Sequence, residues 1–209
     1  MHIAARQPPR PDAQAVLEFW LRDGLQAGWP TENLGWLWFG GEAKLDQDID
    51  ARFGHLVREA AAGGLTDWES SAWDRLALVV LLDQFTRNVF RGQANAFAGD
   101  ARALALARDA FACGWDKVLP LAGRVFLTMP LTHAESLRLQ DDAVHRMQAL
   151  RVVAGAAHDK DLAGFVDFAR KHRDIVAQFG RFPHRNAVLG RESTNQEQDF
   201  LRNGPRFGQ

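Results

Sequence analysis

Two short segments rich in basic and amide side chains are the part of this sequence best suited to chemistry. Residues 179–186 read Phe-Gly-Arg-Phe-Pro-His-Arg-Asn, and Gly190-Arg191 follow shortly after. An earlier segment, residues 84–92, has the similar order Gln-Phe-Thr-Arg-Asn-Val-Phe-Arg-Gly. Guanidinium groups bind carboxylates and phosphates through paired hydrogen bonds. We therefore predict that both segments build one polar site for a small anionic ligand.

The predicted ligand-binding side chains are carboxyl, amide and guanidinium groups, namely Asp83, Gln84, Arg87, Asn88, Arg91, Arg181, Arg185, Asn186 and Arg191. Asp83 ends an apolar run, so its carboxylate should be buried and should need a partner, for which Arg87 is four residues away. The alternative interpretation is purely structural. In that case the arginines satisfy Asp83 and helix-end carbonyls inside the protein, and no ligand site exists.

His133, Glu135 and His184 are the candidate catalytic residues, with an imidazole as general acid or base near Glu135. The spacing predicts that His133 lies in the first turn of a helix capped by Thr132, where the helix dipole favours neutral imidazole. The capping pattern Thr-x-x-Glu explains Glu135 equally well. His172 is predicted to be a core histidine. No metal site is predicted, because the histidines lack the spacing of known zinc motifs and Cys113 is the only cysteine.

Composition excludes several classes of function. The formal net charge of −1 gives no overall attraction to nucleic acid or to an anionic membrane. The longest apolar stretch, Leu76 to Leu82, is far shorter than the ~20 residues of a membrane-spanning helix. The amino-terminal residues lack the apolar run of a secretory signal. No nucleotide-binding glycine motif is present, so no cofactor is predicted. We expect a cytoplasmic location, no nucleic acid partner and no membrane partner.

Helical periodicity dominates the chain, and neither a β-hairpin pattern nor a βαβ rhythm is found. The pattern predicts a flexible segment over residues 1–11 and a single all-α domain of antiparallel helical hairpins over residues 12–209. Three Thr-x-x-Glu patterns, starting at Thr66, Thr132 and Thr194, predict capped helix starts. The predicted helices begin after Pro11 and otherwise cover residues 42–62, 73–82, 101–113, 121–128, 133–153, 161–179 and 195–202.

Four segments together carry a resemblance to a known family: residues 16–20, 81–92, 129–135, and 179–186 with 189–191. In these segments the chain resembles the bacterial family catalogued as domain of unknown function 924. It departs from the family pattern at Thr86, where proline is usual, and at Thr128, where tyrosine is common. The resemblance implies an all-helical fold similar to tetratricopeptide-like hairpins, although the sequence shows no repeat of about 34 residues. It implies no activity.

Two classes of function remain open at this point. The first is an Arg/His/Asn-lined cleft for a small anionic ligand, either as a binding site or as the active site of an enzyme that uses histidine acid–base chemistry. The second is an adaptor without catalysis, which would bind a peptide or protein partner in a groove between helical hairpins. An exposed Trp36 or Trp38 beside a shallow groove would favour the adaptor.

Overall fold

The computed structural model describes residues 7–204, and these residues form helices and connecting turns with no strand among them. The predicted all-α fold is confirmed. Residues 1–6 of the predicted flexible segment lie outside the described part of the chain. The α-helices are α1 (Pro11–Leu21), α2 (Gly24–Ala27), α3 (Gly35–Phe39), α4 (Ala43–Ala61), α5 (Ala72–Val80), α6 (Thr86–Val89), α7 (Asp100–Ala112), α8 (Leu121–Thr132), α9 (Leu137–Ala154), α10 (Asp159–Phe179) and α11 (Asn195–Asn203).

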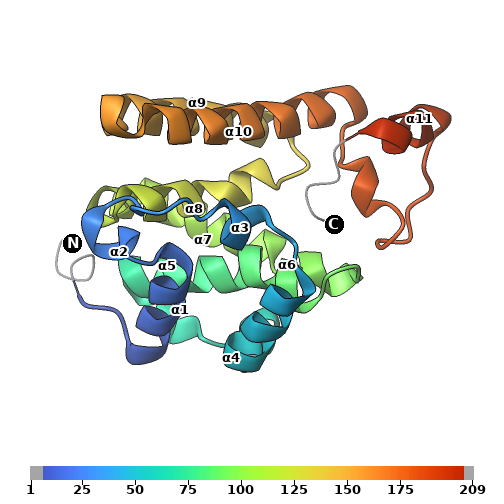
Figure 1. The fold of residues 1–209 in the computed structure, drawn as a ribbon. Coiled ribbons are helices and arrows are strands. Elements are labelled where there is room, and N and C mark those ends of the chain that lie inside the picture. The colour runs from blue at the N-terminus through green and yellow to red at the C-terminus, as the bar shows by residue number, and fades with distance from the viewer. Residues whose placement is uncertain (1–6, 205–209) are drawn as a thin grey trace.

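The helices pack in layers (Figure 1). The antiparallel hairpin of α9 and α10 lies over α8, which packs in turn on α5 and α7. Helix α1 packs against α5, and α4 packs against α6 on the far side of the molecule. The core between these layers is aromatic, since the Trp20 ring lies edge-to-face with Phe85 at 5.3 Å and with Phe126 at 5.5 Å.

A π-helical turn over Leu81–Phe85 joins α5 to α6. The apolar run that precedes it is buried on every face, so the turn is held rigidly by the core. Because a π-helical turn accommodates an extra residue in the helix, it changes which side chains point inward. Asp83 and Gln84 lie in this turn and are both buried. The fold therefore carries two polar side chains into an apolar interior.

The predicted helix boundaries around Pro130 are wrong. Helix α8 continues through Pro130 to Thr132, and His133 follows its carboxyl end instead of beginning a new helix. Nearly every residue of α8 is buried, and this packing outweighs the one backbone hydrogen bond that proline cannot donate in the last turn. Thr132 is consequently no helix cap, and its buried hydroxyl has no hydrogen-bond partner in the described chain.

The other two predicted capping boxes have different outcomes. The box at Thr194 is confirmed, because its side chain accepts from the Glu197 amide while Glu197 accepts from the Thr194 amide. The box at Thr66 is wrong, since Thr66 begins a 3₁₀ turn and Ser71 caps α5 instead. Glu69 forms an ion pair with Arg102 rather than a reciprocal cap.

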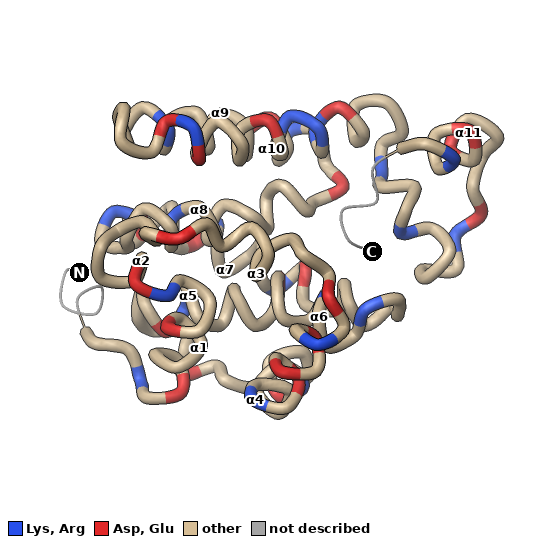
Figure 2. Tube along the Cα trace, viewed as in Figure 1, with Lys and Arg blue, Asp and Glu red and all other residues tan. Residues whose placement is uncertain are grey.

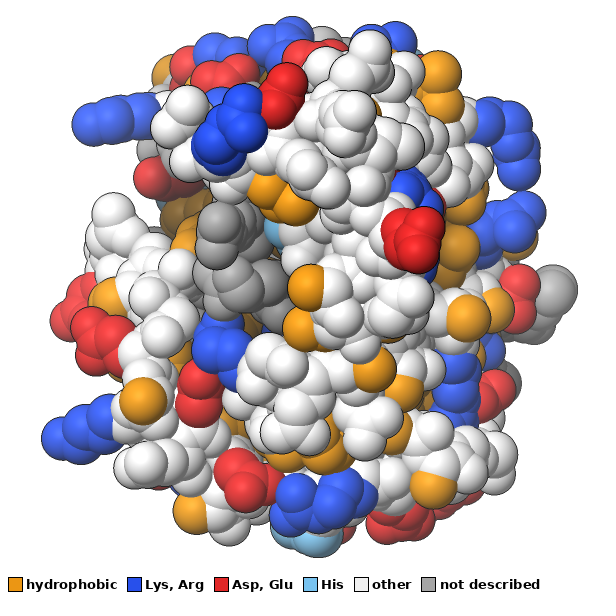
Figure 3. Space-filling model, turned by 90° about the vertical axis from the view of Figure 1, so that its right-hand side faces the viewer, with side chains coloured by type: hydrophobic (Ala, Val, Ile, Leu, Met, Phe, Trp, Pro, Cys, Tyr) orange, Lys and Arg blue, Asp and Glu red, His pale blue; other side chains and the backbone are white. Residues whose placement is uncertain are grey.

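Both acidic and basic residues occur along α4, α7 and the α9–α10 hairpin, so charge of one sign is not confined to one layer (Figure 2). On the face nearest α11, apolar side chains are scattered between charged ones (Figure 3). Within residues 7–204, no helix has the length and apolar character needed to cross a membrane.

Candidate functional site

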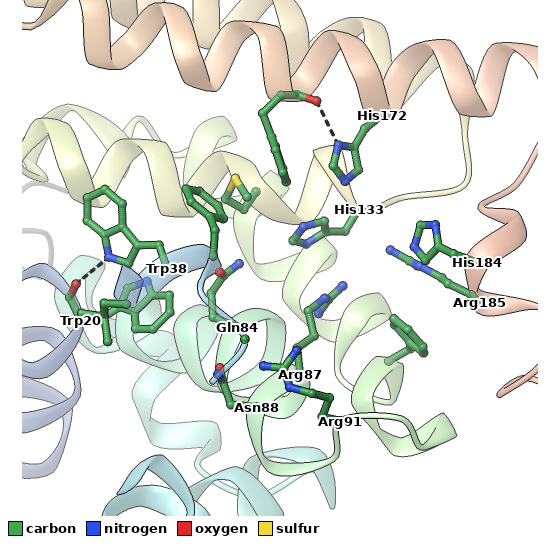
Figure 4. Close-up of a pocket in the computed structure, with 16 residues that line it drawn as sticks. Trp20, Trp38, Gln84, Arg87, Asn88, Arg91, His133, His172, His184 and Arg185 are labelled. Carbon is green, nitrogen blue, oxygen red and sulfur yellow. Dashed lines mark hydrogen bonds between the residues drawn. The ribbon is translucent and has the colours of Figure 1, made fainter. Parts of the chain in front are cut away.

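A cavity of about 160 Å³ lies where the π-helical turn, α6, the end of α8 and α10 meet the segment that precedes α11. Figure 4 shows Trp38 at one end of this cavity and His184 with Arg185 at the other, with Gln84 between them. Seven predicted site residues line it: Gln84, Arg87, Asn88, Arg91, His133, His184 and Arg185. The remaining lining residues are mostly aromatic or apolar, and His172 is among them.

The two Arg-Asn segments converge on one carboxylate, that of Asp100 at the start of α7. Arg87 Nη2 lies 3.0 Å from Asp100 Oδ1, and Arg185 Nη1 lies 3.2 Å from Asp100 Oδ2. Residues 98 positions apart in sequence therefore share a partner, as expected for one composite site. A single carboxylate shared by two guanidinium groups leaves hydrogen-bond donors unused. The buried Nε of Arg185 indeed has no hydrogen-bond partner in the described chain.

Asp83 and His133 form a buried pair at the inner wall of the cavity. His133 Nδ1 lies 2.8 Å from Asp83 Oδ1, while Gln84 donates to the second carboxylate oxygen. Arg87 Nη1 lies 3.8 Å from Asp83 Oδ1 and also donates to the Asp83 backbone carbonyl. An ionised carboxylate only accepts hydrogen bonds, so the proton of neutral His133 resides on Nδ1. Nε2 is then the ring atom with a lone pair available to the cavity.

Burial opposes charge on both members of this pair, and their neighbours decide the outcome. Burial alone would raise the pKa of Asp83, but the electrostatic effects of His133 and Arg87 and two side-chain hydrogen bonds hold it below its ordinary value. The pKa of His133 is lowered, chiefly by burial and further by Arg87, against the opposing effect of Asp83. The pair is therefore an ionised carboxylate beside a neutral imidazole. Neutrality arises from burial, and the predicted helix amino terminus plays no part in it.

Two further histidines of the cavity are also neutral at physiological pH. Burial lowers the pKa of His172 well below its ordinary value, and its Nδ1 lies 2.9 Å from the Phe168 carbonyl oxygen. Burial and the adjacent Arg185 lower the pKa of His184 to about 3. Despite these imidazoles, no group of three or more metal-ligating side chains within residues 7–204 is arranged to hold a metal ion.

Arg185 is the most deeply buried of the cavity cations, with 6% of its surface exposed. Its guanidinium stacks on two rings, 4.6 Å from the centroid of Phe97 and 4.5 Å from that of Phe182. Burial and the nearby Arg87 lower its pKa to about 10, so it keeps its charge at neutral pH. A buried guanidinium with an unused N–H group is well suited to donate hydrogen bonds to a bound anion.

Four further predicted residues form a separate network with Glu197, here called the brace: Glu135, Arg181, Asn186, Arg191 and Glu197. Glu135 accepts from the Phe182 amide at 2.8 Å and pairs with Arg191 at 2.7 Å. Arg181 pairs with Glu197 at 2.6 Å. None of the five lines the cavity. The brace fixes the turn that presents His184 and Arg185. For Arg181 and Arg191, the contacts fit the alternative in which arginines pair with carboxylates inside the protein and bind no ligand.

The chain matches, over residues 16–205, the family model described as a bacterial protein of unknown function (DUF924). It belongs to this family. A solved structure of a protein of unknown function from Agrobacterium tumefaciens is similar, with 36% identity and a TM-score of 0.75 over 92% of this chain and 97% of that chain. No curated protein matches the chain. The comparisons establish family and fold, so any activity must be argued from the site.

Sequence reasoning missed three polar residues of this DUF924 protein's site. Asp100 pairs with both cavity arginines, and Asp46 of α4 accepts from Asn88 at 2.8 Å and from Arg91 at 2.6 Å. His172 was predicted to be a core residue and is buried, but it also lines the cavity. Both aspartates lie in the first turn of a helix, where acidic residues are common for reasons unrelated to function. Only tertiary contacts identify them.

Proposed function

We propose that the cavity binds the carboxylate or phosphate group of a small molecule and that the protein is an enzyme in which His133 transfers a proton. One observation carries the proposal: an Asp–His pair opens onto a cavity that also holds Arg185, whose buried Nε has no hydrogen-bond partner in the described chain. Pairing with carboxylates inside the protein would explain why the arginines are buried. It would not explain why the neutral imidazole of His133 lines the cavity. We place this activity in the cytoplasm.

The roles of the side chains follow from their contacts. Arg87 and Arg185 hold the anion, since both line the cavity and lie side by side on the Asp100 carboxylate. Asp83 is a positioning residue that fixes the tautomer and ring orientation of His133. Nε2 of His133 then accepts a proton from the substrate or returns one to it. His184, beside Arg185, is the second candidate for proton transfer. Glu135 belongs to the brace, and its role is to hold the turn in place.

Binding is tested by thermal denaturation with acetate and inorganic phosphate as probes. A probe at ten times its dissociation constant adds about 1.4 kcal/mol of stability, which for a chain of this size raises the melting temperature by roughly 3–5 °C. The variants Arg87→Lys and Arg185→Lys retain charge but lose the planar fork, and should at least halve this shift. Arg181→Lys is the matched control, because Arg181 belongs to the brace. Equal shifts in all three variants would exclude the cavity as the anion site.

Catalysis is tested with a mixture of anionic metabolites, followed by mass spectrometry. Wild-type protein should deplete at least one compound, and His133→Gln should deplete it about 10²–10⁴ times more slowly, the usual contribution of acid–base catalysis. His145→Gln is the matched control, because His145 lies on α9 outside the cavity. Identical depletion by wild type and His133→Gln would rule out a catalytic role for His133.

One observation favours the adaptor as a second candidate. Trp36 and Phe39 of α3 are 53% and 46% exposed, and large exposed aromatic side chains are frequent in protein interfaces. Under this alternative, Trp36→Ser would abolish retention of a specific protein partner from a bacterial lysate and leave the anion-induced thermal shift unchanged. Retention that persists in this variant would count against the adaptor.

A further inference from the structure

A second hollow, of about 560 Å³, lies beside the cavity between the segment leading into α3 and helix α10. Its floor is aromatic, since Trp29 and Phe165 are buried and pack edge-to-face at 5.9 Å. Its charged lining residues are all solvent-exposed, namely Glu32, Lys160, Asp161 and Lys171. An apolar floor with charges confined to exposed positions suits a hydrocarbon or aromatic group.

This aromatic groove adjoins the cavity through shared side chains. Trp38, Phe39 and Phe168 line both hollows. The Phe39 and Phe168 ring centroids are 5.4 Å apart, and Phe168 lies 4.2 Å from the ring of His172. His172 in turn lies 5.9 Å from His133. A continuous row of rings therefore leads from the groove to the Asp83–His133 pair.

The two volumes indicate how a ligand would divide between the hollows. The cavity, at about 160 Å³, is similar to the ~150 Å³ space that accommodates a benzene-sized molecule. A head group of that size fills it. Only with the groove of about 560 Å³ does the site reach the roughly 300–1,000 Å³ typical of pockets for larger small molecules.

We propose that the ligand is amphipathic, with a carboxylate or phosphate head in the cavity and an apolar tail in the aromatic groove. The inference rests on the anion site proposed above and adds the chemical class of its substrate. Arg87 and Arg185 bind the head, and Phe39 and Phe168 flank the point where the tail leaves the cavity. This assignment also accounts for the exposure of Phe39, which becomes covered when the tail is bound.

The tail is tested by calorimetric titration with a homologous series from acetate through butanoate and hexanoate to octanoate, and with the corresponding alkyl phosphates. Each methylene group buried in the groove should tighten binding about fourfold, which corresponds to roughly 0.8 kcal/mol per group. The two series distinguish a carboxylate head from a phosphate head. Both should show the same dependence on tail length, because the tail occupies the same groove.

Gly164→Leu offers a variant that fills the groove without touching the cavity. A Cβ added at Gly164 meets no other atom within 4 Å, and this residue lines the groove inside α10. Leucine is also a better helix former than glycine, so the variant should fold. Asp167→Leu is the matched control, because Asp167 lies on the same helix, is exposed and lines neither hollow.

Gly164→Leu should bind acetate as wild type does and lose most of the gain in affinity with tail length, whereas Asp167→Leu should keep that gain. Affinity independent of tail length in wild type would overturn the amphipathic ligand and leave the anion site standing. An undiminished gain in Gly164→Leu would also overturn it. If no anion of either series binds, both the anion site and this inference fail.

Discussion

Replacing Asp83 by asparagine removes the one buried negative charge that orients His133, and we expect this to lower the free energy of unfolding by about 2–4 kcal/mol. A hydrogen bond to a charged acceptor, here 2.8 Å long, contributes about 1.5–3 kcal/mol. At 3.8 Å the attraction to Arg87 is about 4 kcal/mol for an effective dielectric constant of ~20. Part of that attraction is offset, because Asp100 still pairs with Arg87 and a neutral amide is less costly to bury.

A double-mutant cycle isolates the interaction between the two side chains. Asp83→Asn, His133→Gln and the double variant are unfolded in urea at pH 7.5, with helix content as the signal. The glutamine amide reaches the position of Nε2 and leaves that of Nδ1 empty, so His133→Gln removes the bond to Asp83. We expect a coupling energy of about 1.5–3 kcal/mol. His133→Asn is the control, because its amide nitrogen takes the position of Nδ1 and should retain most of the coupling.

Two results would refute the reasoning about this pair. Single-variant losses that add to within about 0.5 kcal/mol would show that Asp83 and His133 are not coupled. The second concerns the tautomer. The nitrogen chemical shifts of His133 should place the proton on Nδ1 at pH 7.5, and a proton found on Nε2 would remove the lone pair on which the proposed proton transfer depends.

Four further predictions follow from the contacts. Because the pKa values of the three cavity histidines lie below those of the unfolded chain, the unfolded state binds more protons, so stability present above pH 6.5 is lost as the pH falls. Urea unfolding between pH 4.5 and 6.5 should show this loss, and His184→Asn should reduce its slope by up to about 1.4 kcal/mol per pH unit. Glu135→Gln should destabilise the protein by about 1–3 kcal/mol and leave phosphate binding intact, as chemical unfolding and calorimetry will show. Thr194→Ala should cost about 1 kcal/mol, whereas Thr132→Val should change the unfolding free energy by less than about 0.5 kcal/mol or raise it, since only Thr194 caps a helix. Anion binding should be accompanied by proton uptake near pH 6, measured by calorimetry in buffers with different ionisation enthalpies.

Helix positions were predictable wherever local signals and packing agree. Helices α4, α7 and α10 lie within two residues of their predicted limits, because each has a regular apolar stripe and a glycine at or just beyond its end. The errors cluster around Pro130 and Thr132, where local signals indicate a helix end but the surrounding core favours continuation. The pattern of residues within this helix cannot show whether it ends before Pro130 or continues, because the outcome depends on side chains from other helices.

The sequence predicted most polar residues of the candidate site, but not which of them line the cavity and which belong to the brace. The two Arg-Asn segments do meet. Within the second segment, two arginines four residues apart have different environments: Arg185 lines the cavity, whereas Arg181 belongs to the brace. The partners that decide this, such as Asp100, are 85 residues from Arg185. No local pattern distinguishes a guanidinium bound to a ligand from one that is paired with a distant carboxylate.

The arrangement of arginines and histidines gives the expected proton uptake a physical basis. Burial is the chief cause of the lowered pKa values of His133 and His184, and the positive charges of Arg87 and Arg185 lower them further. A bound anion offsets both positive charges and therefore raises these pKa values. His133 thus becomes a stronger base only when a ligand is present. By linkage, the anion must bind more tightly as the pH falls toward 6, and the protons taken up go chiefly to His133, because the pKa of His184 in the absence of an anion is about 3. Binding that is independent of pH between 5.5 and 7.5 would show that the anion lies away from His133.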